Sequence, residues 1–280
     1  MPIELANVSC SYRSNTDELI PALQDVSLNV GDGEFVGIMG HTGCGKTTLI
    51  HIMSGLLAPD SGMVLLDEQD INSDTYDRNE LRGKVGVVFQ FPDYQLFEST
   101  VEKDVAFGLK HKRLDHEETE ARVRWALETV GLPYQEVRSR SPFSLSGGEK
   151  RRLAIAGAIV TKPRFLMLDE PIAGLDPQCC QSFMRTLASM NCDGTTIVMV
   201  SHNADVMGEY AKRLLVLQDG SLALEGTVQD VFSNLERLRG LHINAGAPRA
   251  IGNMLARRGF NVPHTVTSYK ELLYALKSIL

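Results

Sequence analysis

The sequence predicts an α/β protein built around a phosphate-binding loop. Apolar segments of strand length alternate with segments of helical periodicity along most of the chain. Residues 40–48 match the P-loop pattern G-x-x-x-x-G-K-[ST] at every fixed position. The loop follows an apolar strand, Phe35–Met39, and precedes a helix expected from Thr48 to near Gly55, which is the context that this motif requires. The loop residues are Gly40, His41, Thr42, Gly43, Cys44, Gly45, Lys46, Thr47 and Thr48.

Length and composition indicate one large globular domain with an appendage. The 280 residues are 43% hydrophobic and 22% charged, and the net charge of −7 opposes binding to nucleic acid and anionic lipid. The five cysteines are odd in number and match neither a zinc site nor a disulfide framework, so we expect a reducing compartment. We also expect no signal peptide, and no run approaches the roughly 20 apolar residues that span a bilayer. Work at a membrane would therefore need another protein as the anchor.

The loop predicts a site for nucleotide phosphates. Its glycines let the backbone bend and bring N–H groups up to phosphate oxygens, and the following helix N-terminus adds partial positive charge. Lys46 is expected to contact the β- and γ-phosphates, and the Thr47 hydroxyl to bind Mg²⁺. The alternative is a glycine-rich turn with an ordinary surface lysine. The flanking strand and helix argue against that alternative, because a motif counts only in its context.

The residues before and after the loop are expected to form short strands. Alternating patterns over 3–8 and 22–30 predict two strands joined by a polar loop that contains Tyr12. A turn at 59–62 leads into a strand at 63–66, and residues 78–82 resemble one helical turn. The apolar run 85–89 predicts a strand that ends at Gln90.

A helical insert is predicted next. From 91 to about 143 the pattern is helical, and Asp115 with Glu118 resembles a capping box. The apolar spacing that follows ends at Gly131, which is placed to terminate the helix. Its apolar members are Val123, Ala126, Leu127 and Val130. Together with the helix expected to end at Val160, this gives a helical subdomain at about 91–160.

Beyond the insert, strands and helices alternate again. An apolar strand at 165–168 runs into Asp169 and Glu170, a helix is expected at 177–190, and a strand at 196–200 precedes His202. Residues 214–218 and 221–224 flank Asp219-Gly220, which is a strong hairpin signal.

The last forty residues, 241–280, form a separate extension. A linker-like turn at 245–248 precedes a short helix with Ile251, Met254 and Leu255 on one face, ending near Gly259. Ser268 and Glu271 form a capping box for a final helix, whose apolar residues are Leu272, Leu273, Leu276 and Leu280. Two short helices bury little alone, so they must pack on the main domain or on a partner. Periodicity shows an apolar face but not what covers it, so both possibilities stay open.

Several polar residues at strand ends could carry hydrolysis. Asp169 would hold Mg²⁺ through water, and Glu170 could orient and deprotonate an attacking water. Gln90 could contact both Mg²⁺ and that water, and His202 is placed to touch a γ-phosphate. Each residue alone has an ordinary structural explanation, namely a helix cap, a strand end or a packed histidine.

Residues 145–149, Leu-Ser-Gly-Gly-Glu, make a purely structural explanation of these residues less suitable. Ser146 and Glu149 form a capping box, and Gly147-Gly148 leaves the backbone N–H groups of the helix N-terminus uncovered. This predicts a second phosphate-binding helix N-terminus. A well-capped helix would be the plain explanation, but the order of all these motifs disfavours it. The segment consists of Leu145, Ser146, Gly147, Gly148 and Glu149.

With these motifs, residues 3–235 resemble an ATP-binding cassette (ABC) ATPase. The resemblance implies a P-loop domain with a helical and an antiparallel β subdomain, and ATP and Mg²⁺ as cofactors. It implies that Tyr12 stacks on adenine and that Asp176, in Ala173-Gly174-Leu175-Asp176, lies in the loop linking two ATP sites. It further implies a head-to-tail dimer, in which residues 145–149 contact the γ-phosphate held by the other subunit.

A narrower resemblance is to the second of two paralogous ATPases of energy-coupling factor (ECF) transporters. Residues 89–98, 100–108 and 140–143 carry it, and residues 241–280 are similar to the dimerisation segment of that family. The resemblance implies a second ATPase subunit in a heterodimer or homodimer, a transmembrane coupling protein and a membrane protein that captures a vitamin or metal ion. It implies a groove after Gln90 for the coupling helix, and a peripheral position on the cytoplasmic face of a bacterial membrane.

The chain departs from the family pattern at three positions. Cys44 stands where serine is commoner, Glu149 replaces a glutamine and Ile172 replaces a threonine. None of these changes removes a residue needed for hydrolysis.

Two alternatives remain beside the ECF interpretation. One is a cobalt- or nickel-type importer, or another ABC importer, with a single kind of ATPase. The other is a soluble ABC protein acting on nucleic acid, which the acidic charge disfavours. Lys46 and Ser146 are also only 100 residues apart, without sustained heptads for a long coiled coil. The transported substrate leaves no mark on this chain.

Overall fold

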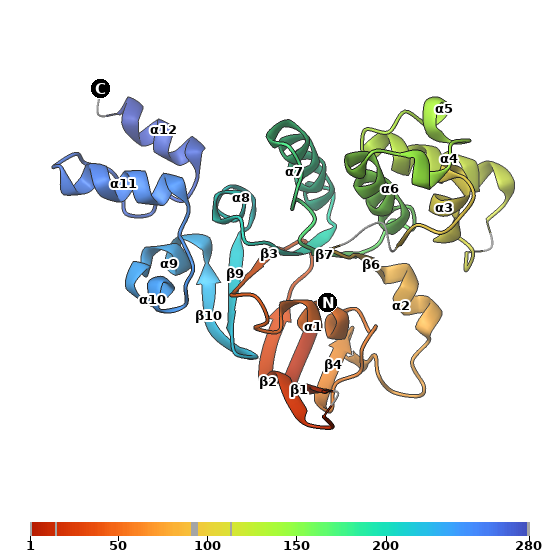
Figure 1. Ribbon diagram of the computed structural model, residues 1–280, viewed down its shortest axis with the longest axis horizontal. Coiled ribbons are helices and arrows are strands. Elements are labelled where there is room, and N and C mark those ends of the chain that lie inside the picture. The colour runs from red at the N-terminus through yellow and green to blue at the C-terminus, as the bar shows by residue number, and fades with distance from the viewer. Residues whose placement is uncertain (1, 15, 91–94, 113, 279–280) are drawn as a thin grey trace.

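The computed structural model describes residues 2–14, 16–90, 95–112 and 114–278. It contains two β-sheets, with a group of helices at one side and the C-terminal helices at the opposite side (Figure 1). This arrangement confirms the predicted α/β class with a helical and an antiparallel β subdomain. Residues 91–94, Phe-Pro-Asp-Tyr, were part of the narrower resemblance and lie outside the described residues.

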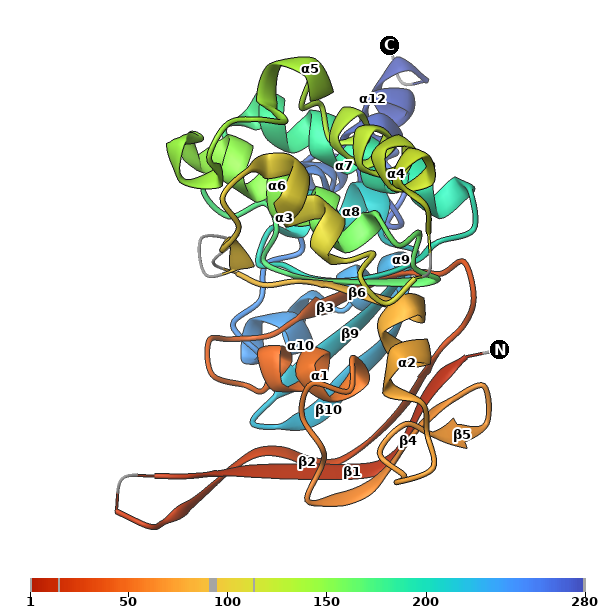
Figure 2. The same cartoon turned by 90° about the vertical axis from the view of Figure 1, so that its right-hand side faces the viewer.

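The first sheet is antiparallel and has the strand order β2-β1-β4-β5. Strands β1 and β2 are longer than the alternating pattern predicted, and they form a ribbon that extends from the molecule (Figure 2). Tyr12 therefore lies in β1, opposite Ile20 of β2, and not in the loop where we had expected it. The short β5 was not predicted. The bounds are β1 Ile3–Arg13, β2 Leu19–Val30, β4 Ser61–Leu66 and β5 Gln69–Asp70.

The second sheet has the order β10-β9-β3-β8-β7-β6, and all its pairs are parallel except β10 with β9. Strands β3, β7 and β8 are buried along their whole length, as their continuous apolar runs predicted. Asp219 and Gly220 both have positive φ and close the predicted β9–β10 hairpin. The bounds are β3 Phe35–Met39, β6 Val85–Val88, β7 Phe165–Asp169, β8 Thr196–Val200, β9 Arg213–Gln218 and β10 Ser221–Thr227.

The parallel sheet separates two hydrophobic cores. Val36 and Ile38 of β3 pack with the antiparallel sheet and α1, whereas Phe35 and Met39 pack with helices on the opposite face. Figure 2 shows the sheet between these two layers. The helices that flank it are α1 Lys46–Met53, α2 Arg78–Lys84, α7 Pro177–Cys192 and α8 Ala204–Tyr210, of which α8 was not predicted.

The helical insert is present where it was expected. Asp115 caps α4 by accepting a hydrogen bond from the Glu118 N–H, and Val123, Ala126 and Leu127 are buried. Helix α6 begins with the predicted capping box. The bounds are α3 Val101–Phe107, α4 His116–Thr129, α5 Tyr134–Val137, the 3-10 helix Pro142–Ser144 and α6 Gly147–Ile159.

The C-terminal region contains four helices, with bounds α9 Val228–Ser233, α10 Leu235–Gly240, α11 Ala247–Arg257 and α12 Tyr269–Lys277. The capping box of Ser268 and Glu271 is confirmed. Leu272 and Ala275 pack with Val262 and Val266 into a small core of their own.

Part of the predicted apolar face remains uncovered in this chain. Ile251 is 40% exposed, Met254 57% and Leu273 55%. Of the predicted stripe, Leu255, Leu272 and Leu276 pack within this chain, so packing in cis covers part of the apolar face and leaves the rest exposed. Leu280 lies outside the described residues. Within the described part of the chain, no helix is long and apolar enough to cross a membrane.

Candidate functional site

The P-loop follows β3 and has a backbone that only glycine adopts easily. Gly40, Gly43 and Gly45 have φ of 151°, 82° and 103°. A Cβ on Gly40 would lie 2.5 Å from the Leu217 carbonyl oxygen, and one on Gly45 would lie 2.3 Å from that of Ala22. The loop is therefore enclosed by backbone from both sheets and opens at the N-terminus of α1, which begins at Lys46.

Lys46 is held over this loop. Its side chain is buried, and Nζ donates hydrogen bonds to the carbonyl oxygens of Gly40 at 2.9 Å and His41 at 2.8 Å. These contacts place the ammonium group at the centre of the curved backbone. An ammonium beside a helix N-terminus makes a strong anion site.

Thr47 and Asp169 meet at the carboxyl edge of the parallel sheet. The Thr47 hydroxyl donates to Asp169 Oδ2 at 2.6 Å. Both are hard oxygen donors of the kind that Mg²⁺ prefers. Among the described residues, no cluster of three His, Cys, Asp or Glu side chains could hold a metal ion. Two protein oxygens fit Mg²⁺, which keeps several water and phosphate ligands, better than they fit a metal caged by protein.

Glu170 follows Asp169 and is nearly buried, with a left-handed backbone at φ 48°. Burial raises its pKa to about 7, and the negative charge of Asp169 acts in the same direction. A carboxylate with this pKa is suited to accept a proton at neutral pH.

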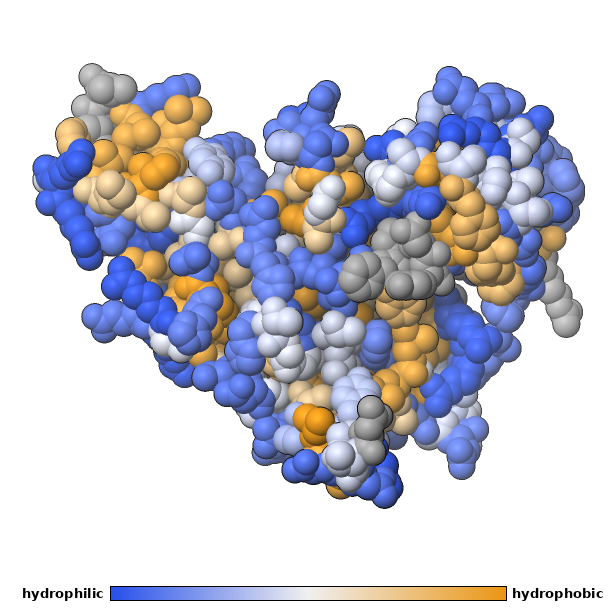
Figure 3. Space-filling model, viewed as in Figure 1, coloured by the Kyte–Doolittle hydropathy of each residue, from blue (hydrophilic) through white to orange (hydrophobic). Residues whose placement is uncertain are grey.

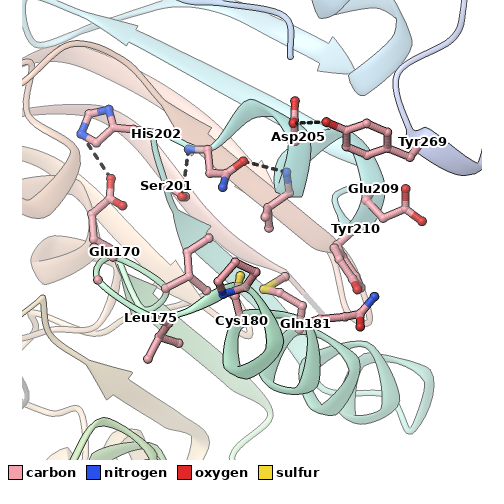
Figure 4. Close-up of a pocket in the computed structure, with 17 residues that line it drawn as sticks. Glu170, Leu175, Cys180, Gln181, Ser201, His202, Asp205, Glu209, Tyr210 and Tyr269 are labelled. Carbon is pink, nitrogen blue, oxygen red and sulfur yellow. Dashed lines mark hydrogen bonds and ion pairs between the residues drawn. The ribbon is translucent and has the colours of Figure 1, made fainter. Parts of the chain in front are cut away.

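His202 lies beside Glu170, with Nε2 3.2 Å from Oε1 (Figure 4). Glu170 Oε1 is buried without a hydrogen-bond partner among the described residues, so the two side chains are close but not hydrogen-bonded. Burial lowers the pKa of His202, and the nearby Lys46 lowers it further. At neutral pH the imidazole is therefore neutral and free to donate to a new acceptor.

Tyr12 lies beside the first turn of α1, next to the P-loop. Its hydroxyl is 3.2 Å from Thr48 Oγ1, and the residue is 45% exposed. An exposed aromatic ring anchored at a P-loop helix provides a surface on which a flat base can stack. The sequence indicated Tyr12 only through the family resemblance.

Gln90 lies two residues beyond the end of β6, whereas we had expected it at the strand end. Its carbonyl oxygen accepts a hydrogen bond at 3.0 Å from Nη2 of Arg151. No contact between its side chain and Thr47 or Asp169 occurs among the residues described. Any contact with a metal or a water therefore requires that the side chain move or that the ligand bring the partners together.

The signature segment 145–149 is well formed but remote from the P-loop. The Ser146 hydroxyl accepts from the Glu149 N–H at 3.3 Å, and Glu149 accepts from the Ser146 N–H at 2.8 Å. A Cβ on Gly147 or Gly148 would meet nothing within 4 Å, so this helix N-terminus is uncovered. No hydrogen bond or ion pair of the described residues joins the segment to residues 40–48. Leu145 is buried and anchors it.

Asp176 caps α7 in the loop after Glu170. Its carboxylate accepts from the N–H groups of Gln178 and Cys179 at 3.0 and 2.9 Å. A hydrogen bond from the Cys179 thiol, together with these backbone bonds, holds the pKa of Asp176 below the usual range. The glycine-containing turn that precedes it, at Ala173 and Gly174, is exposed.

The site contains one connecting residue that we did not predict. Arg151 of α6 is buried, and its guanidinium donates to the carbonyl oxygens of both Gln90 and Ala173. It therefore links the signature helix to two loops of the site. The only signal in the sequence was the pair Arg151-Arg152 in an otherwise apolar helix, and a pair of arginines does not reveal its partners.

Comparisons with known proteins agree with these motifs. The family model described as "ABC transporter" matches residues 23–173. The chain is 42% identical to the energy-coupling factor transporter ATP-binding protein EcfA2 of Symbiobacterium thermophilum, covering 100% of this chain and 97% of that protein. It is 39% identical to the EcfA2 protein of Clostridium tetani, covering 97% of this chain and 94% of that protein.

Solved structures of ATP-binding cassettes are also similar to this chain. The cassette MJ0796, in a dimeric post-hydrolysis state with ADP and Pi, matches with TM-score 0.73 and 33% identity, over 80% of this chain and 98% of that chain. Clostridium perfringens cbiO1, described as part of the ABC transporter complex cbiONQ, matches with TM-score 0.72 and 33% identity, over 92% of this chain and 96% of that chain.

Proposed function

We propose that this chain, which belongs to the ABC transporter family and within it to the ATP-binding proteins of energy-coupling factor transporters, is the ATP-hydrolysing motor of such an importer. The observation that carries the proposal is the grouping of the P-loop, Asp169, Glu170 and His202 at one sheet edge. A degenerate nucleotide-binding module would lack at least one of these groups. Here each is present.

Each of these residues has its own role in ATP hydrolysis. The P-loop N–H groups and Lys46 bind the phosphates, and Tyr12 stacks on adenine. Thr47, Gln90 and, through water, Asp169 would hold Mg²⁺, which would neutralise phosphate charge when bound. Glu170 accepts the proton of the attacking water. His202 transfers its contact from Glu170 to the γ-phosphate.

The signature segment acts on a second subunit. Within this chain it makes no bond to the P-loop, yet its helix N-terminus is open to an anion. We infer that Ser146 and Gly148 bind the γ-phosphate held by a partner ATPase, with Asp176 in the loop between the two sites. ATP is then a clamp between two subunits, and hydrolysis releases it.

A groove beside α3 would receive the transmembrane coupling protein. A groove of about 530 Å³ lies between β6, α3 and α6. Phe97 and Phe107 line this groove, 56% and 40% exposed, and their rings are in edge contact with centroids 4.7 Å apart. An amphipathic helix docks in such a groove through apolar anchors.

The extension at 241–280 would hold the two ATPases together. Figure 3 shows a hydrophobic area over α11 and α12. Its exposed members include Ile251, Met254, Phe260 and Leu273. A contiguous apolar surface of this kind marks a protein interface. A paralogous ATPase is the favoured partner, and a second copy of this chain is the alternative.

These contacts would place the protein on the cytoplasmic face of a bacterial membrane, beside a membrane protein that captures a vitamin or other micronutrient. No nucleic acid is required. A cobalt- or nickel-type importer with a single kind of ATPase is the second candidate. The number of different ATPases that purify with the coupling protein separates the two.

The decisive experiment is Glu170→Gln in the complex purified with its coupling protein. Removal of the proton acceptor should lower the ATPase rate by about 10²–10⁴-fold while ATP still binds and holds the subunits together. The binding of labelled ATP and the rate of phosphate release report the two effects. Normal turnover in the Glu170→Gln complex would refute the proposed role. Recovery of nucleic acid in place of a membrane protein would refute the transporter assignment.

A further inference from the structure

The carboxylate of Asp205 joins the loop of His202 to the C-terminal extension. Asp205 lies in the first turn of α8, three residues after His202. One oxygen accepts from the Ala247 N–H at the start of α11, at 2.6 Å. The other accepts from the Tyr269 hydroxyl at the start of α12, at 2.8 Å (Figure 4). Hydrogen bonds to a carboxylate are roughly twice as strong as neutral ones.

Short local bonds carry this connection back to His202. The Asn203 N–H donates to Ser201 Oγ at 3.1 Å, and the Asn203 side chain caps α8 by accepting from the Val206 N–H at 3.1 Å. These bonds flank His202 on both sides. The loop and the first turn of α8 therefore form one rigid unit.

Further along α8, the helix also lies close to the backbone of the extension. A Cβ on Gly208 of α8 would lie only 2.2 Å from the Thr267 carbonyl oxygen, just before α12. Helix α8 thus touches the backbone of the extension, with no side chain between them. A displacement of the extension moves α8 directly.

A cavity lies between α8 and α7, so this side of α8 has no backbone contact like the one with Thr267. Its volume is about 740 Å³, and its lining runs from Glu170 and His202 to Tyr269. Tyr210 and Cys180 line it between those ends. On this side α8 borders the cavity, whereas the extension contacts it directly at Asp205 and Gly208.

We propose that Asp205 and Tyr269 are positioning residues through which the C-terminal extension sets the distance between His202 and Glu170. The proposal rests on the proposed function, because it assigns His202 and Glu170 to ATP hydrolysis. Coupling between two sites is reciprocal in binding free energy. Occupation of the site by the γ-phosphate, which draws His202 away from Glu170, therefore shifts the extension.

Tyr269→Phe tests the effect of the extension on ATP hydrolysis, since it removes the hydroxyl and keeps the ring. In the purified complex we expect kcat to fall about three- to tenfold, because only part of the free energy of one lost charge-assisted hydrogen bond acts on the position of His202, and we expect KM for ATP to stay constant. Asp205→Ala should lower kcat at least as much, and Asp205→Asn, whose amide can still bond both partners, should restore most of it. Tyr210→Phe is the matched control. The Tyr210 hydroxyl lines the same cavity without a hydrogen bond among the described residues, and its removal should leave kcat unchanged.

Hydrogen exchange of the backbone amides tests the reverse direction. In the unmodified complex, a non-hydrolysable ATP analogue should change exchange in residues 245–249 and 265–272. Tyr269→Phe should bind the analogue equally well but lose that change. Equal exchange in both nucleotide states of the unmodified complex would overturn the proposal, as would unmodified kcat in Tyr269→Phe. Absence of ATPase activity in the unmodified complex would instead contradict the proposed function.

Discussion

Glu170 shows how burial prepares a single residue for catalysis. A carboxyl group with an ordinary pKa is a weak base at neutral pH. Here burial, helped by Asp169, raises the pKa to about 7. The same burial destabilises the fold as pH rises from about 4.5 to about 7, because the folded state retains a proton that the unfolded state has released. The site therefore exchanges stability for a stronger base.

This pKa predicts the pH dependence of ATP hydrolysis. Protonated Glu170 cannot accept a proton from water, so kcat/KM should fall as pH decreases through about 7 and should level off above it. Initial rates at low ATP concentration across about pH 6 to 8 measure this profile. ATP binding over the same range is the control and should stay constant. A flat kcat/KM profile with constant binding would exclude Glu170 as the base.

At the scale of elements, Arg164 ties the two sheets together. Its guanidinium donates to both oxygens of Asp32, at 2.6 and 2.7 Å, and to Asp67 at 2.7 Å. Asp32 lies in the loop between β2 and β3, Asp67 follows β4, and Arg164 precedes β7. The bond from Arg164 holds the pKa of Asp32 below its usual range. This ion pair therefore stabilises the fold above that range and is lost in acid.

Arg164→Ala should destabilise the protein by about 1–2 kcal/mol, because the exposed Asp32 and the partly buried Asp67 each lose a charge-assisted hydrogen-bond donor. Urea unfolding measures the difference. Arg13→Ala is the matched control: the ion pair of Arg13 with Asp17 has 74% and 85% exposed side chains, and its loss should cost less than about 1 kcal/mol. Equal effects of the two substitutions would show that Arg164 is only a surface contact.

Elements with a strong local signal were predicted well, and short ones were missed. Strands β3, β7 and β8 are continuous apolar runs, and α6 has a capping box. Helices α8, α9 and α10 have six or seven residues each, which is too short for a clear periodicity. Their helical conformation depends on tertiary packing. Strand β1 likewise continues past Val8 to Arg13 because β2 pairs with it.

At the scale of the whole molecule, two surfaces of the chain are suited to binding other subunits. Its signature helix N-terminus is open, and the apolar face of its extension is uncovered. The apolar face is unfavourable in water, and the open helix N-terminus is free to bind an anion. Assembly with a second ATPase would satisfy both at once.

Met254→Glu should weaken that assembly. A charge placed in the apolar face must be desolvated on association, so we expect the dissociation constant of the two ATPases to rise about tenfold or more. Sedimentation velocity measures it. Thr265→Glu, an exposed polar position of the same extension with the same change of charge, is the control and should have little effect. Unchanged association of Met254→Glu would place the interface elsewhere.

The sequence by itself determined the α/β class, the P-loop context and the candidate residues for ATP hydrolysis. It could do so because these depend on local patterns: a glycine loop between a strand and a helix, apolar runs, and caps. Only the tertiary structure decided that Glu170 has a pKa of about 7, that Arg151 links two loops, and that Asp205 meets the C-terminal extension. Burial and contacts between residues distant in sequence arise from how the elements pack. No local pattern of residues specifies that packing.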